Sequence, residues 1–471
     1  MEIIHVSAEC YPVAKAGGLG DVVGTLPKYQ QVAGHVAKVV IPMYRTKFLM
    51  ENAWEVVHKG YTNLGSWWFP YTVIKEKTNR LGFDLYLVDI YGLLDREMIY
   101  GYGDDLERFV SFQIAVVDWI SSWNHRPDLI HLHDHQAGLI AFMIKYCYRY
   151  QHLQSTPTVL TIHNAQYQGW LGWDKSHYLP AWDSWKSGLL EWGGTINSLA
   201  CGIKCSHAVT TVSRSYLQEL RISANGLEAL FEYEKGKCLG ILNGIDESVW
   251  DPQTDPYIGD HYSRTDADKG KLDNKKLICE KFDLSQERPL IVFIGRLVGE
   301  KGADLLAQAI GDSFYYIGRK MNFMILGSGF PEVEYQLENL RMLSHRDYGI
   351  YIGYNESLSH LLYAGADFIL MPSRVEPCGL NQMYAMRYGT VPVVRDTGGL
   401  RDTVVDFGDP QGYGIRFNNA AVGDITQAIW RAVELYQDKA KMKSIRSYMM
   451  QIDFSWETSV KQYLDLYQSL T

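Results

Sequence analysis

The stretch from 367 to 400, DFILMPSRVEPCGLNQMYAMRYGTVPVVRDTGGL, holds residue types that could bind a charged ligand. Its carboxylate, Glu376, comes shortly before Gly379, where a helix is predicted to begin. Free N–H groups at a helix N-terminus suit a phosphate, whereas a carboxylate repels one. We therefore expect Glu376 to face a neutral part of the ligand, such as sugar hydroxyls. The alternative is that Glu376 is only a favourable charge at a helix start.

Two strands and a helix are predicted to position this carboxylate. Residues 367–371 are interpreted as a short buried strand, because a continuous apolar run follows Asp367. In 379–387 apolar residues recur at helical spacing, and Gly389 stands where a helix would end. A second strand at 391–394 leads into the turn TGG at 397–399. Ligands in such βαβ units bind outside the carboxyl ends of the strands, so we expect both turns at the ligand site.

Cations follow another predicted strand upstream of this stretch. Residues 288–310 read as strand, loop and helix, and the loop contains Arg296 and Lys301. With the helix start at Gly379 and the TGG turn, these cations could bind a diphosphate and stabilise it as a leaving group without a metal ion. The alternative is that both are exposed loop charges.

The first half of the chain also places polar residues after strands. A strand at 1–7 precedes the Gly-rich loop AECYPVAKAGGLGD, where Lys15 adds charge beside accessible backbone. A helix is expected from Val22, and a strand in 156–169 carries His163 at its end. With the carboxylates of Glu9, Asp21 and Asp134, these groups suit a neutral, hydroxyl-rich partner.

His131, His133 and His135 alternate along a predicted strand, where all three would share one face and could bind a metal. Metal sites usually need further ligands from elsewhere, so we interpret these residues as structural or substrate-contacting. Cys201 and Cys205 lack the second pair that a zinc site needs and are interpreted as buried thiols.

A polar run from 252 to 276 contains Asp266-Ala-Asp268, which resembles the metal-binding DxD of some glycosyltransferases. We read this run as solvated chain rather than a strand end, and therefore expect no metal there.

Composition limits the classes of function. The net charge of −9 argues against a general nucleic-acid binder. No stretch approaches 18 apolar residues, and residues 1–8 enter a strand at once, so we expect a cytoplasmic protein without a membrane partner.

The strand–loop–helix pattern restarts in the second half of the 471 residues, which indicates an α/β protein with two doubly wound Rossmann-like domains facing across a deep cleft. We expect an acceptor-side domain at 1–240 and a nucleotide-sugar-binding domain at 241–455. The amphipathic helix at 456–471 would pack back on the first domain. Such a cleft suits group transfer from a nucleotide-sugar to a carbohydrate, with closure of the domains on the ligands.

Six segments together resemble the bacterial glycogen synthase and plant starch synthase family, in the family's order and over nearly the whole chain. They are KAGGLGDV (15–22), TIHNAQYQG (161–169), GILNGID (240–246), IGRLVGEKG (294–302), PSRVEPCGLNQMYAMRYGT (372–390) and TGGLRDTV (397–404). The resemblance implies a GT-B fold and transfer of glucose, usually from ADP-glucose, to the non-reducing end of an α-1,4-glucan with retention of anomeric configuration. No cofactor is implied, because the nucleotide-sugar is a substrate.

The resemblance also implies roles for matching residues. Glu376 would bind the donor glucose, His163 would lie near the reacting sugar, and Arg296 and Lys301 would contact the donor phosphates, all four as catalytic residues. The donor-binding set would be Lys15, Gly17, Gly18, Asn243 (at the interdomain hinge), Tyr354 (stacking on the base), Cys378, Gly379, Leu380, Asn381, Thr397, Gly398 and Gly399. Acceptor contacts are assigned to Glu9, Asp21 and Asp134.

The chain departs from the family at Asn381 and Ala16, where Thr is common, but Asn381 can still donate a hydrogen bond. Three alternatives stay open at this point: UDP-glucose as donor, a glucan-binding relative without catalysis, and a glucan phosphorylase using pyridoxal phosphate. Loss of Glu376, Arg296 or Lys301 would indicate the second, and all three are present.

Overall fold

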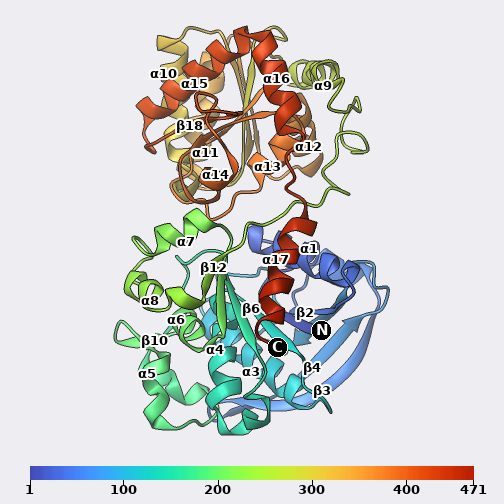
Figure 1. The fold of residues 1–471 in the computed structure, drawn as a ribbon, viewed down its shortest axis with the longest axis vertical. Helices are drawn as coiled ribbons and strands as arrows, with labels where there is room; N and C mark the ends of the chain where they lie inside the picture. Colours follow the sequence, from blue (N-terminus) through green and yellow to red (C-terminus); the bar gives the residue numbers. More distant parts are fainter. The chain divides into compact units, whose positions relative to one another are not determined.

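The computed structural model describes all 471 residues, which divide into two units. One unit consists of Met1–Asn243 with Trp456–Thr471, and the other of Gly244–Ser455. Each contains a largely parallel β-sheet flanked by helices (Figure 1). The predicted α/β class with Rossmann-like sheets is thereby confirmed.

The sheet of the first unit has the strand order β12-β11-β7-β6-β1-β2-β5-β4-β3. Strands from β12 to β5 run parallel, while β4 and β3 add an antiparallel edge. The strands are β1 (Glu2–Val6), β2 (Val36–Pro42), β3 (Trp54–Leu64), β4 (Trp67–Glu76), β5 (Asp84–Asp89), β6 (Leu129–His133), β7 (Thr158–Ile162), β11 (Ala208–Thr211) and β12 (Cys238–Gly240). The chain proceeds from β1 to β2 on one side and from β6 to β7 on the other. The strand order therefore reverses between β1 and β6, the position where α/β sheets bind ligands.

Helices cover this sheet, and a small second sheet of β8 (Trp170–Leu171), β9 (Glu191–Trp192) and β10 (Thr195–Asn197) lies in the Trp-rich segment. The helices are α1 (Gly18–Val32), α2 (Lys47–Glu51), α3 (Asp105–Ser121), α4 (His135–Tyr146), α5 (Ser187–Leu190), α6 (Ser198–Cys205), α7 (Arg214–Leu220), α8 (Glu228–Tyr233) and α17 (Trp456–Gln468). The last helix, α17, packs beside α1 (Figure 1). Its buried Trp456, Val460 and Tyr463 share a core with Ile3 and Leu129 of the sheet.

The second unit has a six-stranded, fully parallel sheet in the order β15-β14-β13-β16-β17-β18. The strands are β13 (Leu290–Ile294), β14 (Asn322–Gly327), β15 (Tyr348–Ile352), β16 (Phe368–Met371), β17 (Val391–Arg395) and β18 (Ile415–Phe417). The helices are α9 (Ala267–Phe282), α10 (Leu306–Tyr316), α11 (Pro331–Asn339), α12 (Glu356–Gly365), α13 (Asn381–Arg387), α14 (Gly398–Thr403), α15 (Val422–Gln437) and α16 (Lys439–Met449). Here the strand order reverses between β13 and β16.

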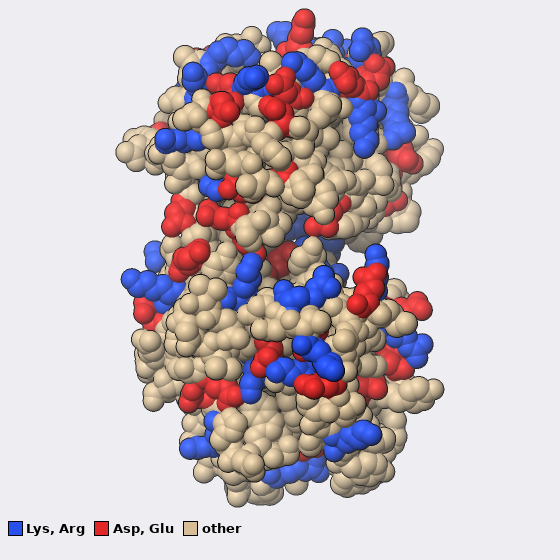
Figure 2. Space-filling view, turned by 90° about the vertical axis from the view of Figure 1, so that its right-hand side faces the viewer, with Lys and Arg blue, Asp and Glu red and all other residues tan.

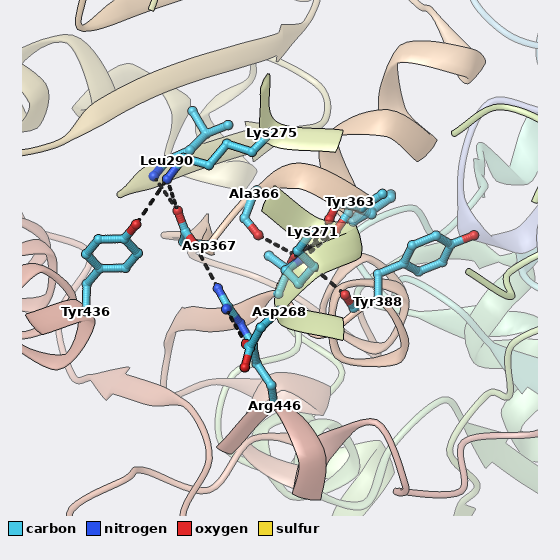
Figure 3. Close-up of polar contacts among 12 residues, drawn as sticks. Asp268, Lys271, Lys275, Leu290, Tyr363, Ala366, Asp367, Tyr388, Tyr436 and Arg446 are labelled. Atoms are coloured by element: carbon cyan, nitrogen blue, oxygen red, sulfur yellow. Dashed lines mark hydrogen bonds and ion pairs between the residues drawn. The ribbon is translucent and has the colours of Figure 1, made fainter. Parts of the chain in front are cut away.

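Helix α9 corrects the expectation of a solvated run before residue 276. Two of its lysines are buried, Lys271 and Lys275, each 2% exposed. Lys275 Nζ lies 2.7 Å from Asp367, the residue before β16, and Arg446 of α16 donates to both Asp367 and Asp268 (Figure 3). The DxD-like carboxylate of Asp268 therefore belongs to an ion-pair network that fixes two helices to the sheet.

The ammonium group of Lys271 forms hydrogen bonds with neutral oxygen atoms rather than an ion pair with a carboxylate. Its Nζ donates to the backbone oxygens of Tyr363, Ala364 and Tyr388 and to the Thr390 hydroxyl at 2.7–3.2 Å (Figure 3). Burial lowers the pKa of Lys271 well below its usual value. Because these partners are three backbone oxygens and the Thr390 hydroxyl, Lys271 ties α9 to the chain around β16 and β17.

Acidic and basic side chains are interspersed on the face shown in Figure 2. None of the helices combines the length and the apolar character needed to cross a membrane.

Candidate active site

The reversal of strand order in the second unit brings together two predicted site residues. Lys301 follows β13 and Glu376 follows β16, and the carboxyl ends of these neighbouring parallel strands lie at the same edge of the sheet. Lys301 Nζ consequently lies 2.7 Å from both Oε1 and Oε2 of Glu376, across 75 residues of sequence. From the sequence we assigned Glu376 to the sugar and Lys301 to the phosphates. In the structure the two side chains form one ion pair.

The ion pair is buried on one side and accessible on the other. Glu376 is 6% exposed, and its Oε2 also accepts a 2.8 Å hydrogen bond from the Ser373 hydroxyl. The Lys301 side chain keeps 25% of its surface exposed. Arg296 is half-exposed and makes only a 3.4 Å contact with Glu300. A ligand anion can therefore reach both cations, while the carboxylate is held in place.

The Thr397-Gly398-Gly399 segment supports the backbone of Glu376. Thr397 is the N-cap of α14, so these residues begin a helix rather than form a free turn. A Cβ atom on Gly398 would lie 2.0 Å from the Glu376 carbonyl oxygen, and one on Gly399 would lie 2.0 Å from that of Cys378. The Gly399 N–H already donates to the Glu376 carbonyl at 3.0 Å. These glycines are thus required where two backbones touch.

The loop between Glu376 and α13 adopts a conformation that glycine favours. Gly379 has φ +72°, and Leu380 holds the N-cap position, so α13 begins at Asn381 rather than at Gly379. Asn381 Nδ2 donates to the Ile294 carbonyl at 2.7 Å, which ties the start of α13 to the end of β13. Cys378 is buried, whereas Tyr354, two residues beyond β15, is 77% exposed.

In the first unit, Glu9 organises the Gly-rich loop after β1. Its Oε2 accepts hydrogen bonds from the backbone N–H groups of Ala16 and Gly17 at 2.7 and 3.0 Å, and the Tyr100 hydroxyl donates to Oε1 at 2.7 Å. Glu9 is 3% exposed, and burial raises its pKa against the effect of these hydrogen bonds. Glu9 thus holds the backbone of the Gly-rich loop, and its expected contact with the acceptor stays a prediction.

The Gly-rich loop is shorter than expected, because α1 begins at Gly18 instead of Val22. A Cβ atom on Gly17 or Gly18 would meet no atom within 4 Å, so the backbone is open to an approaching ligand at this point. Lys15 forms a 2.7 Å ion pair with Asp21 on α1. Asp21, which we expected to contact the acceptor, is therefore paired with Lys15 of the Gly-rich loop.

Asp134 and His163 meet where β6 and β7 end. Asp134 has φ +56°, and its Oδ1 accepts the backbone N–H of His163 at 2.7 Å. Burial raises the pKa of Asp134 to about 7 and lowers that of His163 to about 3. Asn243, the last residue before the second unit, is 4% exposed, and its amide oxygen has no hydrogen-bond partner.

The histidine group differs from the sequence expectation. His135 is the first residue of α4 and not part of the strand. The third histidine beside His131 and His133 is His5 of β1, and ring nitrogens of these three lie within 4.8 Å of one another. Sequence reasoning missed His5, although a histidine inside the apolar run EIIHV marks an unusual buried polar position.

Comparison with known proteins first defines the class. Residues 274–446 match the family model of glycosyl transferases group 1. Sucrose-phosphate synthase from Thermosynechococcus elongatus superimposes with a TM-score of 0.65 at 16% identity, covering 99% of this chain and 98% of that one, which shows a shared fold. The protein is a glycosyltransferase with the GT-B fold.

Further comparisons define the family. Residues 2–233 match the starch synthase catalytic domain. A glycogen synthase from Flavobacterium johnsoniae is 54% identical over 99% of this chain and 98% of its own, and one from Streptococcus sanguinis is 36% identical over the full length of both. The catalytic domain of starch synthase IV from Arabidopsis thaliana, bound to ADP and acarbose, is 32% identical with a TM-score of 0.91 over 100% of this chain and 99% of that one. The chain belongs to the glycogen synthase and starch synthase family, and its activity is that of a glycogen-synthase glycosyltransferase.

Proposed function

We propose that the protein transfers glucose from ADP-glucose to the non-reducing end of an α-1,4-glucan, with retention of configuration and without a metal ion. The observation that carries the proposal is the Lys301–Glu376 ion pair at the β13–β16 reversal, with the half-exposed Arg296 following β13 as Lys301 does. Support for the nucleotide comes from the ADP bound to the related Arabidopsis starch synthase.

The charges of this group suit the separation of charge during transfer. As the bond between glucose and phosphate breaks, positive charge develops on the sugar ring and negative charge on the diphosphate. Lys301 and Arg296 stabilise the departing diphosphate, and the carboxylate of Glu376 stabilises the sugar side. The ammonium of Lys301 has several N–H donors, so a phosphate competes with Glu376 for them and leaves carboxylate oxygens for sugar hydroxyls.

Retention follows, on this proposal, from attack on the same face of the sugar, guided by the leaving phosphate. Glu376 is fixed by Lys301 and Ser373, which favours binding of hydroxyls over attack on the anomeric carbon. His163, Lys15 and the open backbone at Gly17 and Gly18 are assigned to the sugar and phosphates on the basis of the family resemblance.

A donor screen tests the proposal. Initial rates are measured with ADP-, UDP- and GDP-glucose on a maltooligosaccharide acceptor, and the anomeric configuration of the product is read by NMR. We expect the fastest turnover with ADP-glucose and an α-linked product. Equal or faster turnover with UDP-glucose would reject the assigned donor, and binding of the glucan without turnover of any donor would identify an inactive relative.

A further inference from the structure

A continuous hydrogen-bonded chain of buried side chains connects Gln30 of α1 with His163. Gln30 Oε1 lies 2.7 Å from His5 Nε2, His5 Nδ1 lies 3.1 Å from His133 Nε2, and His133 Nδ1 lies 3.0 Å from His163 Nε2. Gln30, His5 and His133 are fully buried, and His163 is 8% exposed. This series of hydrogen bonds thus extends from the interior of the first unit to His163, a predicted site residue.

The chemistry of the groups fixes the direction of every bond in this chain. An amide oxygen only accepts, so His5 Nε2 must carry a proton. Burial lowers the pKa of His5 to about 4 and that of His133 well below its usual value, so each ring is neutral and has a single N–H. His5 Nδ1 therefore accepts from His133 Nε2–H, and His133 Nδ1 accepts from His163 Nε2–H.

A second branch begins at the same amide and agrees with this assignment. Gln30 Nε2 donates to the Tyr467 hydroxyl of α17 at 3.3 Å, and that hydroxyl lies 2.7 Å from His131 Nδ1. His131 Nε2 then lies 2.5 Å from the Thr161 hydroxyl. The Tyr467 hydroxyl therefore donates a hydrogen bond to His131 Nδ1, and His131 Nε2–H donates one to the Thr161 hydroxyl oxygen. One orientation of the Gln30 amide thus satisfies both branches.

We propose that Gln30, His5 and His133 are positioning residues that hold His163 in its Nε2–H tautomer and leave His163 Nδ1 bare. A bare Nδ1 accepts a hydrogen bond and cannot donate one. At this nitrogen, His163 therefore accepts a hydrogen bond from a sugar hydroxyl. The identity of that hydroxyl partner rests on the proposed function. The tautomer itself does not, because it is set in the ligand-free protein.

A metal ion bound by His5, His131 and His133 is the alternative explanation of the cluster. Every ring nitrogen of these three residues already has a polar partner in one of the two branches. No carboxylate belongs to the group, so the charge of a buried dication would be uncompensated. The hydrogen-bonded chain explains the cluster without such a cost.

The test measures the tautomer directly in the full-length protein without ligands. Histidine labelled with 15N is incorporated, and two-dimensional long-range 1H–15N spectra distinguish Nε2–H, Nδ1–H and doubly protonated rings; His163→Gln assigns the signal. We expect a single Nε2–H form of His163 near neutral pH. An Nδ1–H form, which a reversed Gln30 amide would produce, would overturn the proposal, as would an imidazolium or stoichiometric zinc in the purified protein.

A pair of variants then tests the role of Gln30. Gln30→Met keeps the side-chain length but removes the acceptor of the His5 proton, so the His163 signal should become a mixture of tautomers. Turnover should fall with the fraction of molecules that retain a bare Nδ1, on the order of twofold for an equal mixture. Gln113→Met on α3 is the matched control, because Gln113 is equally buried and bonds only backbone atoms.

The control should keep a single His163 tautomer and unchanged kcat. A Gln30→Met protein that retains a single Nε2–H form would refute the positioning role of Gln30. Absence of transfer from ADP-glucose in the wild type, with the expected tautomer present, would instead reject the proposed function alone.

Discussion

Gly398→Ala tests whether the contact between the start of α14 and Glu376 matters for catalysis. The added Cβ would lie 2.0 Å from the Glu376 carbonyl oxygen, whereas real Cβ contacts essentially never fall below 3.0 Å, so the backbone must retreat by about 1 Å (3.0 minus 2.0 Å). Gly398 also has φ +46°, where a side chain is disfavoured. A retreat of this size would disturb the 2.7 Å contacts between Glu376 and Lys301.

A displacement of about 1 Å at a reacting group can cost ~100-fold in rate, and we expect that loss in kcat for Gly398→Ala. Overpacking and the unfavourable φ should also lower the free energy of unfolding by about 1–3 kcal/mol. The assays are initial rates with saturating ADP-glucose and glucan, and urea unfolding followed by fluorescence.

Gly423→Ala is the matched control in the same unit, because its Cβ would meet no atom within 4 Å and it lies in the first turn of α15. It should leave kcat unchanged and stabilise the protein by up to ~1 kcal/mol. A folded Gly398→Ala protein with near wild-type kcat would refute the argument that this glycine holds Glu376 in place.

Three further outcomes are expected. Arg296→Met should weaken ADP binding and raise the activation free energy of transfer by about 3 kcal/mol. The free energy of unfolding should change little, because the side chain is half-exposed. An unchanged ADP affinity by titration calorimetry would show that Arg296 does not bind the phosphates. EDTA should leave the transfer rate unchanged, and loss of activity restored by magnesium or manganese would contradict the metal-free proposal. The pKa of Asp134 is raised from 3.8 to about 7 in the folded protein, so the folded state binds the extra proton between these values and this group destabilises the fold progressively as pH rises through that window. The stability of Asp134→Asn relative to wild type, from urea unfolding, should therefore increase from about pH 4 to about pH 7, and a constant difference would contradict the raised pKa.

Both sheets and the strand ends with polar residues were predictable because apolar runs of strand length alternate with helical periodicity. The sequence therefore identified Lys301 and Glu376 separately. It did not predict their ion pair, because the neighbour of β13 is β16 and not the next strand in the chain. Helix α9 was missed for a different reason. Its buried positions include Lys271 and Lys275, whose hydrogen-bond partners lie 92 or more residues away in sequence.

The role of TGG at 397–399 and the histidine chain were also beyond local patterns. Two consecutive glycines in the sequence indicate a turn. Only the fold shows that Gly398 and Gly399 lie so close to the backbone of Glu376 and Cys378 that no Cβ atom fits. His5, Gln30 and Tyr467 lie far apart in sequence and meet His133 and His131 only through the parallel sheet and α17. Packing, not spacing, determines which of these polar groups become partners.

Glu376→Gln tests the division of roles at the ion pair most directly. The substitution keeps the size of the side chain, removes its charge and releases Lys301 from a competing carboxylate. We predict that kcat falls by roughly 100-fold, the scale for losing one preorganised stabilising group. The Kd of ADP measured by calorimetry should stay the same or decrease. A near-normal kcat, or a loss of ADP affinity as large as the loss of kcat, would contradict the assignment of Glu376 to the sugar and of Lys301 to the diphosphate.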